Sequence, residues 1–186
     1  MKTYEIYLKS TAPIQFSRYH DIERLDRESY EAYEERTWRE KAHFNDEGYV
    51  IIPGTFLKNA LSEVAKYLSM QIPGKGKQTF TKHFEAGVLI IDPIILGIKK
   101  EGLICSKVFV PSDGKKGAGK RVWKKFPTLM SWEGSTNFII LDEIITKEVL
   151  TEHIIQCGRF QGLGTWRPRN GGLYGRFDVL KVTEVK

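Results

Sequence analysis

Residues 51–61, IIPGTFLKNAL, decide the start of the fold, because an apolar run stops at Pro53 and Gly54 and a helical pattern begins at once. The run 49–52 is short and apolar. Thr55 then stands where a helix N-cap is expected. Apolar residues recur at helical spacing after it, and they are Leu57, Leu61, Val64 and Leu68. The stretch therefore predicts a tight turn that ends a short apolar run and starts an amphipathic helix.

The segments on either side add further strands and a second helix. Residues 3–10 alternate between polar and apolar and predict a first strand. A second helix is expected over 147–157. Further strands are expected over 84–98 (interrupted at Asp92 and Pro93), 102–110, 137–141 and 173–185. With insertions set aside, the order is β-α-β-β-α-β, so we predict an α+β fold of modified ferredoxin-like type, the arrangement of RNA-recognition-motif folds.

The charge of the 186-residue chain is unevenly divided. The whole chain carries +6, but residues 21–47 hold ten acids and five bases, a balance of −5, which leaves +11 for the other 159 residues. We interpret residues 18–50 as an acidic helical insertion within a single domain that spans 1–186, with the helix at 21–42. A basic body favours acidic partners such as nucleic acid.

Composition also indicates a class and a compartment. A hydrophobic content of 41% is sufficient for a core. The two cysteines lie far apart and form no CxxC pair, which fits a reducing, cytoplasmic environment and argues against a zinc site. The first ten residues lack the apolar core of a signal peptide, and no run is long enough to span a bilayer. We expect a cytoplasmic protein without a membrane partner.

Residues 158–177, GRFQGLGTWRPRNGGLYGRF, form the most distinctive segment. Six of these residues are glycine, four are arginine and none is acidic. Glycine lets a backbone approach a ligand closely, and arginine matches phosphate and stacks on rings. We therefore expect a loop that binds an anionic, flat-faced ligand, with nucleic acid as the obvious candidate. Its predicted contacts are Arg159, Trp166, Arg167, Arg169, Asn170, Tyr174 and Arg176.

A second basic loop is expected at residues 112–125. It has cations around one tryptophan, a combination that suits phosphates and a stacked base. The alternative is a solvated loop whose tryptophan enters the core. The spacing is close to a phosphate-binding Walker loop, but Arg121 replaces the magnesium-binding hydroxyl, which argues against nucleotide hydrolysis. The predicted contacts are Lys115, Lys116, Lys120, Arg121, Trp123, Lys124 and Lys125.

Lys58 lies in the first turn of the predicted helix, where a cation opposes the helix dipole. A phosphate bound between the free N–H groups and Lys58 would resolve this conflict. An exposed lysine that costs a few tenths of a kcal/mol is an equal alternative. Both interpretations stay open at this point.

Catalytic patterns are weak in this chain. The four histidines lack ligand spacing, and the neighbouring acids Asp142 and Glu143 have no matching cluster, so no metal site and no cofactor are expected. His20, beside Arg18 and Tyr19, is a candidate acid or base for RNA cleavage, but no partner group is evident. We expect a binding protein rather than an enzyme.

Together, the segment 51–61 and the glycine loop resemble the RAMP superfamily, which includes the backbone subunits of CRISPR effector complexes. The resemblance rests on Pro53, Gly54, Lys58 and residues 162–175. It implies an RNA-binding backbone-type subunit that grips the guide RNA without sequence specificity and assembles head to tail, as a homo-oligomer or with effector subunits. The acidic segment would then dock on a neighbour's basic face. A loop of RPRNGG type also occurs in similar short phage proteins.

Single-stranded RNA is therefore the expected partner, and Arg18 and Lys58 join the predicted contacts of the two loops. Two alternatives remain from the sequence. One is a phage single-stranded DNA-binding protein, because no reader of the 2′-hydroxyl is evident. The other is a metal-independent endoribonuclease of the same fold.

Overall fold

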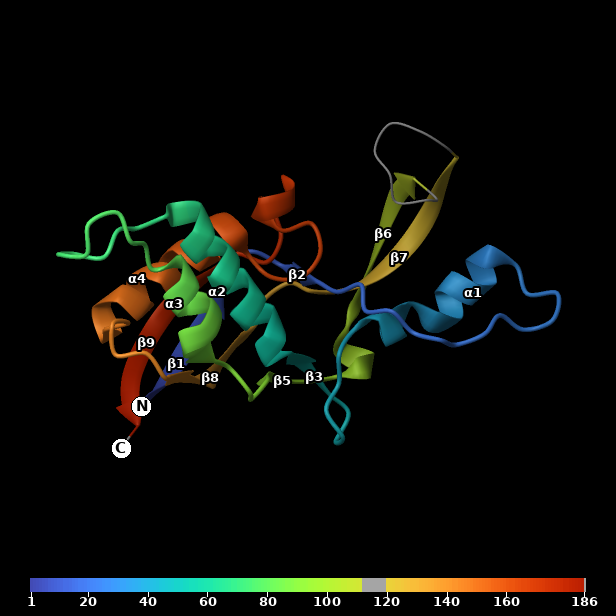
Figure 1. Cartoon of the computed structure of the whole chain (residues 1–186). Helices are drawn as coiled ribbons and strands as arrows, with labels where there is room; N and C mark the ends of the chain where they lie inside the picture. The colour runs from blue at the N-terminus through green and yellow to red at the C-terminus, as the bar shows by residue number, and fades with distance from the viewer. Residues whose placement is uncertain (112–119, 186) are drawn as a thin grey trace.

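A four-stranded antiparallel sheet forms the base of the larger lobe in the computed structural model, which describes residues 1–111 and 120–185 (Figure 1). The strand order is β4-β8-β1-β9, and all neighbours are antiparallel. In β1 the alternating Tyr4, Ile6 and Leu8 are buried, as the sequence pattern predicts. The strands are β1 (Lys2–Ser10), β4 (Val88–Leu89), β8 (Glu133–Ile140) and β9 (Phe177–Val185).

Three helices lie together against one face of this sheet (Figure 1). They are α2 (Gly54–Leu68), α3 (Thr81–Gly87) and α4 (Lys147–Gln156). The apolar stripe of α2 is largely buried, including Leu57, Leu61 and Val64. Thr146 caps α4, because its side chain accepts a hydrogen bond from the Val149 N–H group. A π-helical turn, Cys157–Gln161, then leads from α4 into the glycine loop.

The smaller lobe consists of a hairpin and one helix (Figure 1). Strands β6 (Ile104–Pro111) and β7 (Arg121–Leu129) pair along their length, and β2 (Ile14–Gln15) joins β7 near the larger lobe. Helix α1 (Tyr30–Thr37) continues into a 3₁₀ turn, Trp38–Lys41, and both lie against β7. A separate two-stranded sheet pairs β3 (Tyr49–Ile52) with β5 (Ile94–Lys99). Short 3₁₀ turns cover Lys100–Gly102 and Pro168–Asn170.

Several boundaries differ from the sequence-based expectation: β8 begins four residues earlier, at Glu133, and β9 four residues later, at Phe177. Residues 121–125, expected in a loop, form the first half of β7, because Val122 and Trp123 stand opposite Val110 and Phe109 across the hairpin. Residues 84–87, expected in a strand, end helix α3. The acidic helix begins only at Tyr30, where Ser29 caps it. Lys115 and Lys116, which the sequence predicts to contact nucleic acid, lie outside the described residues.

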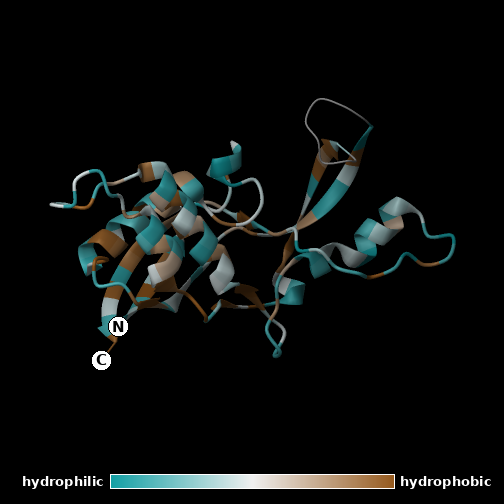
Figure 2. Ribbon diagram, viewed as in Figure 1, coloured by the Kyte–Doolittle hydropathy of each residue, from teal (hydrophilic) through white to brown (hydrophobic). Residues whose placement is uncertain are grey.

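The acidic insertion docks on the hairpin of its own chain. Glu34 accepts hydrogen bonds from Lys41 Nζ at 2.7 Å and from the Lys125 N–H group at 2.9 Å. Glu35 forms an ion pair with Lys125, and Glu31 lies 3.6 Å from Lys107. Figure 2 shows the hydrophilic character of this helix. The basic face that the sequence analysis assigned to a neighbouring copy is therefore partly covered from within.

Among the residues described, no helix has the length and apolar character that a bilayer crossing requires.

Candidate nucleic-acid interface

The glycine loop is fastened to the segment that follows β1. Gly175 N–H donates to the Pro13 carbonyl at 2.7 Å, and Thr165 N–H donates to the Gln15 carbonyl at 2.8 Å. Gly175 has φ +75°, and a Cβ there would collide with the Leu163 carbonyl. Only glycine combines this backbone conformation with such a close approach. The loop is thus held in one shape by backbone contacts.

This fastening brings Arg167 and Arg18 to one hollow of about 420 Å³. Thr165 Oγ1 lies 2.9 Å from Ser17 Oγ, so the loop and the segment before Arg18 are joined. Neither arginine forms an ion pair with another described residue. The Nε atom of Arg167 is buried and has no hydrogen-bond partner in the described chain. Two guanidinium groups therefore face one space without compensating carboxylates.

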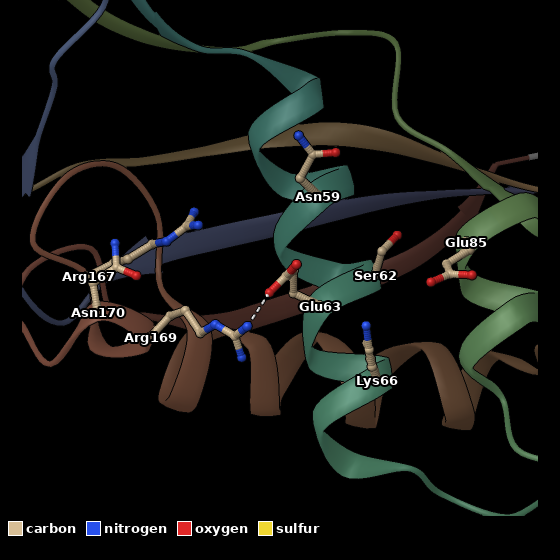
Figure 3. A pocket seen from close by; sticks show the side chains of 8 residues that line it. All are labelled: Asn59, Ser62, Glu63, Lys66, Glu85, Arg167, Arg169 and Asn170. Atoms are coloured by element: carbon tan, nitrogen blue, oxygen red, sulfur yellow. Dashed lines mark ion pairs between the residues drawn. The ribbon is translucent and has the colours of Figure 1, made fainter.

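Arg167 also lines a second hollow, of about 520 Å³, between the loop and α2 (Figure 3). In Figure 3 the loop side chains of Arg167, Arg169 and Asn170 face the polar side of α2. Arg169 donates across this space to Glu63 at 2.9 Å. Lys66 adds a further cation from α2. Arg169 is therefore partly neutralised, whereas Arg167 is not.

A third hollow lies on the far side of Arg169. Arg159 and Arg176 line it together with the rings of Tyr67 and Phe160, whose centroids are 5.8 Å apart. Arg176 is held by weak hydrogen bonds, 3.4 Å long, to the carbonyls of Arg159 and Leu173. Cations and rings thus lie side by side at this end of the loop.

On the other side of Arg18, two more hollows lead to the hairpin. The nearer one is lined by Ser17, Arg18 and Lys124, and it shares Lys124 and Tyr33 with the farther one, which contains Trp123. The five hollows thus form a series from Arg176 to Trp123, in which each hollow shares at least one lining side chain with the next. We call this series of five hollows the cation track. Its cations without an ion-pair partner in the described chain are Arg18, Lys66, Lys120, Lys124, Arg159, Arg167 and Arg176.

The structure gives Lys58 a role that differs from the predicted one. Its Nζ donates to the carbonyls of Phe84 at 2.6 Å and Glu85 at 2.8 Å, and to Ser62 Oγ at 3.1 Å. These carbonyls belong to the last turn of α3, where a cation is favourable. Burial lowers the pKa of Lys58, and the nearby Glu85 opposes that shift. All three ammonium protons therefore have acceptors within the protein. Lys58 joins α2 to α3, in place of the phosphate contact that we predicted for it.

Of the remaining residues predicted to contact nucleic acid, some line the cation track and others lie outside it. Lys125 lines the hairpin hollow but is paired with Glu35. Arg121 lies over the ring of Phe109, 5.4 Å from its centroid. Trp166 is 38% exposed, and Tyr174 is half-buried; neither lines any of the five hollows.

Several residues of the track escaped the sequence analysis. Tyr67 and Asn59 project from the polar side of α2, Lys41 follows α1, and Phe160 sits in the π-helical turn. The polar face of the predicted α2 was a usable signal for the first two. No signal in the sequence indicated that Lys41 lies near Arg18.

The histidines do not form one cluster. His20 lies beside Tyr33, with 6.1 Å between ring centroids, in the hollow that contains Lys124. His43 lines the hollow of Arg18 and packs edge-on against Phe56, 5.1 Å between centroids. Burial, with help from Arg18, lowers the pKa of His43, which favours its neutral form. His83, on α3, donates from Nδ1 to the Asp142 carboxylate at 2.6 Å, which lowers the pKa of that carboxyl, and it lines none of the five hollows.

The fold is similar to that of one chain in a solved structure described as "Cryo-EM structure of the Type III-B Cmr-beta bound to cognate target RNA". The similarity covers all of the present chain, with a TM-score of 0.63 and 12% sequence identity. The present chain spans 61% of that chain. At this identity the likeness concerns the fold alone.

A second chain, from a structure described as "CRISPR RNA-guided surveillance complex", has 13% identity over 84% of this chain and 58% of its own. Its TM-score of 0.32 is too low to carry an argument. No protein-family model matches the sequence, and no curated protein matches it.

Proposed function

We propose that this protein is an RNA-binding subunit of a CRISPR-type effector complex, and that the cation track holds the sugar-phosphate backbone of a single strand. The observation that carries the proposal is the continuity of the track. Arg18 lines both a hollow beside the glycine loop and a hollow that leads to the hairpin, so it links the two regions. Arginines or lysines without an ion-pair partner in the described chain line these hollows and their neighbours. Phosphate contacts of this kind give affinity without reading bases.

The topology supports the finer assignment of the fold. The strand order β4-β8-β1-β9 and the crossovers through α2 and α4 fit a ferredoxin-like unit, interrupted by α1 and by the β6–β7 hairpin. In this interpretation both interruptions lie at one end of the sheet. They then extend the binding surface beyond the glycine loop.

The test is a titration of the protein with an unstructured RNA of about 12 nucleotides, a length within the range of single-strand sites. We expect micromolar or tighter binding at low salt, and a log–log salt slope of about −0.7 for each phosphate neutralised. The double variant R18Q/R167Q is expected to weaken binding at least about tenfold and to reduce the slope by about 1.4.

The matched control is K181Q, which removes an exposed cation from β9, outside the five hollows. It should change the affinity less than about twofold. Equal losses in K181Q and R18Q/R167Q would show that net charge alone attracts RNA. A DNA strand of the same sequence separates an RNA subunit from a general single-strand binder, and intact RNA after incubation separates binding from cleavage.

A further inference from the structure

The largest hollow of the track, about 700 Å³, lies between α1 and β7. One wall carries the rings of Tyr30 and Tyr33 from the acidic insertion, and the other carries Val122 and Trp123 from the hairpin. Its size is within the range of small-ligand sites. The insertion is therefore part of a lined hollow and not only a cover over the hairpin.

The rings of this hollow are well exposed. Trp123 is 57% exposed and Tyr30 is 78% exposed, and the guanidinium of Arg24 lies over one face of the Tyr30 ring, 4.7 Å from its centroid. Phe109 supports Trp123 from the side, with 5.1 Å between ring centroids, and Lys107 lies 5.4 Å from the tryptophan ring. An exposed indole that is held by a neighbouring ring offers a ready stacking surface.

The charges around the hollow suit a nucleotide. Lysines line it on the hairpin side and on its edges, and they are Lys107, Lys120, Lys124 and Lys125. The two carboxylates in its lining are compensated: Glu34 accepts from Lys41 and from the Lys125 N–H group, and Glu31 lies near Lys107. A stacking surface with cations beside it is what an unpaired base and its phosphate require.

Its place on the track indicates where such a base comes from. The hollow shares Tyr33, Glu34 and Lys124 with the hollow that contains Arg18. We propose that it receives an unpaired nucleobase from the strand whose backbone lies in the cation track. This inference rests on the proposed function and adds a contact to the base itself, contributed jointly by the insertion and the hairpin.

The test compares two strands of about 12 residues, one of oligocytidine and one with the same ribose-phosphate backbone but no bases. Fluorescence anisotropy is measured with the wild-type protein and with W123A, W123F, Y30A and R18Q/R167Q. We expect W123A and Y30A to weaken binding of the base-bearing strand about tenfold and to leave the abasic strand unchanged. W123F should restore most of the loss, because phenylalanine also stacks.

The outcomes separate the two proposals. If W123A weakens both strands equally, or neither, the base site is wrong, whereas the backbone track stands as long as R18Q/R167Q weakens both. If the wild-type protein binds neither strand at low salt, the proposed function fails and the base site fails with it. Because Trp123 is exposed, an unchanged melting temperature of W123A confirms that the fold is intact.

Discussion

The glycine loop and the β6–β7 hairpin place cations on one surface by different means. In the loop, backbone hydrogen bonds from Gly175 and Thr165 fix the chain, and Arg167 faces a hollow without an ion-pair partner in the described residues. On the hairpin, Lys125 and Lys107 face the carboxylates of α1. A cation is therefore available to a ligand only where no carboxylate of the same chain neutralises it.

The two regions also differ in what holds them in place. The loop depends on glycine at positions of close backbone approach, and it packs on the larger lobe. The hairpin depends on strand pairing and on the ion pairs of α1, which salt screens. We therefore expect the loop to be sensitive to small steric changes and the hairpin to be sensitive to charge.

The largest expected effect breaks the loop. In G175A the new Cβ would meet the Leu163 carbonyl, and a residue with φ +75° is strained as well. We expect a loss of more than about 3 kcal/mol in the free energy of unfolding. Chemical denaturation measures it, and RNA affinity should fall together with stability.

G171A is the control for this prediction. Gly171 has φ +76°, but a Cβ there would meet nothing within 4 Å. Only the conformational cost of about 1 kcal/mol is then expected. Similar losses in the two variants would show that backbone conformation, and not close approach, makes the loop sensitive.

The second prediction compares one arginine of the loop with one lysine of the hairpin. R167Q should weaken RNA binding about three- to tenfold, because its guanidinium lacks a carboxylate partner in the described structure. K125Q should change binding less than about twofold, because Glu35 already neutralises that ammonium. Anisotropy titrations at one salt concentration measure both. A larger loss in K125Q than in R167Q would reverse the comparison.

The third prediction releases the hairpin cations. The variant E31Q/E35Q removes the carboxylates that face Lys107 and Lys125. We expect RNA affinity to rise about two- to fivefold at low salt, and the gain to disappear at high salt as charges are screened. E47Q, an exposed acid of the same segment outside the five hollows, is the control and should give little change.

The smallest effect concerns pH. Burial lowers the pKa of His43, with Arg18 adding to the shift, and burial also lowers the pKa of His153. Because the folded-state pKa values lie below the unfolded value of about 6.5, the unfolded chain binds protons first as pH falls. Stability is therefore full above about pH 7 and declines below about pH 6.5, until the folded-state values are reached.

Melting temperatures between about pH 7.5 and pH 5.5 measure this decline. H43Q and H153Q should each make it shallower. His43 lines the hollow of Arg18, whereas neither β6 nor β7 contains a histidine. A wild-type melting temperature that rises on acidification would contradict the assignment of both histidines as neutral groups.

The sequence predicts those elements that local pattern determines. The turn at Pro53 and the stripe of α2 were visible because helical spacing is a local signal. The first half of β7 was not visible, because nearby glycines and lysines indicated a loop. Its Trp123 pairs with Phe109 on the other strand of the hairpin, and this pairing is not a local signal. The same limit applies to Lys58, whose acceptors in α3 lie more than twenty residues away.

For the candidate site, the sequence predicted which residues are cationic better than it predicted which of these cations are free to bind a phosphate. Arg167 and Arg18 could be named from composition, and the structure places them in one hollow. That Lys125 meets Glu35 follows only from the docking of the insertion on its own hairpin. Charge pairing between distant segments depends on tertiary structure, which a local pattern does not contain.

The central claim is that the loop and the hairpin form one continuous track. It is tested most directly by moving a single photoreactive 5-iodouridine along a bound RNA of about 12 nucleotides and mapping the crosslinked peptides. We expect crosslinks to the peptide that contains Phe160 from one end of the strand and to the peptide that contains Trp123 from the other, with a fixed polarity. Crosslinks confined to one of the two regions at every position would contradict it.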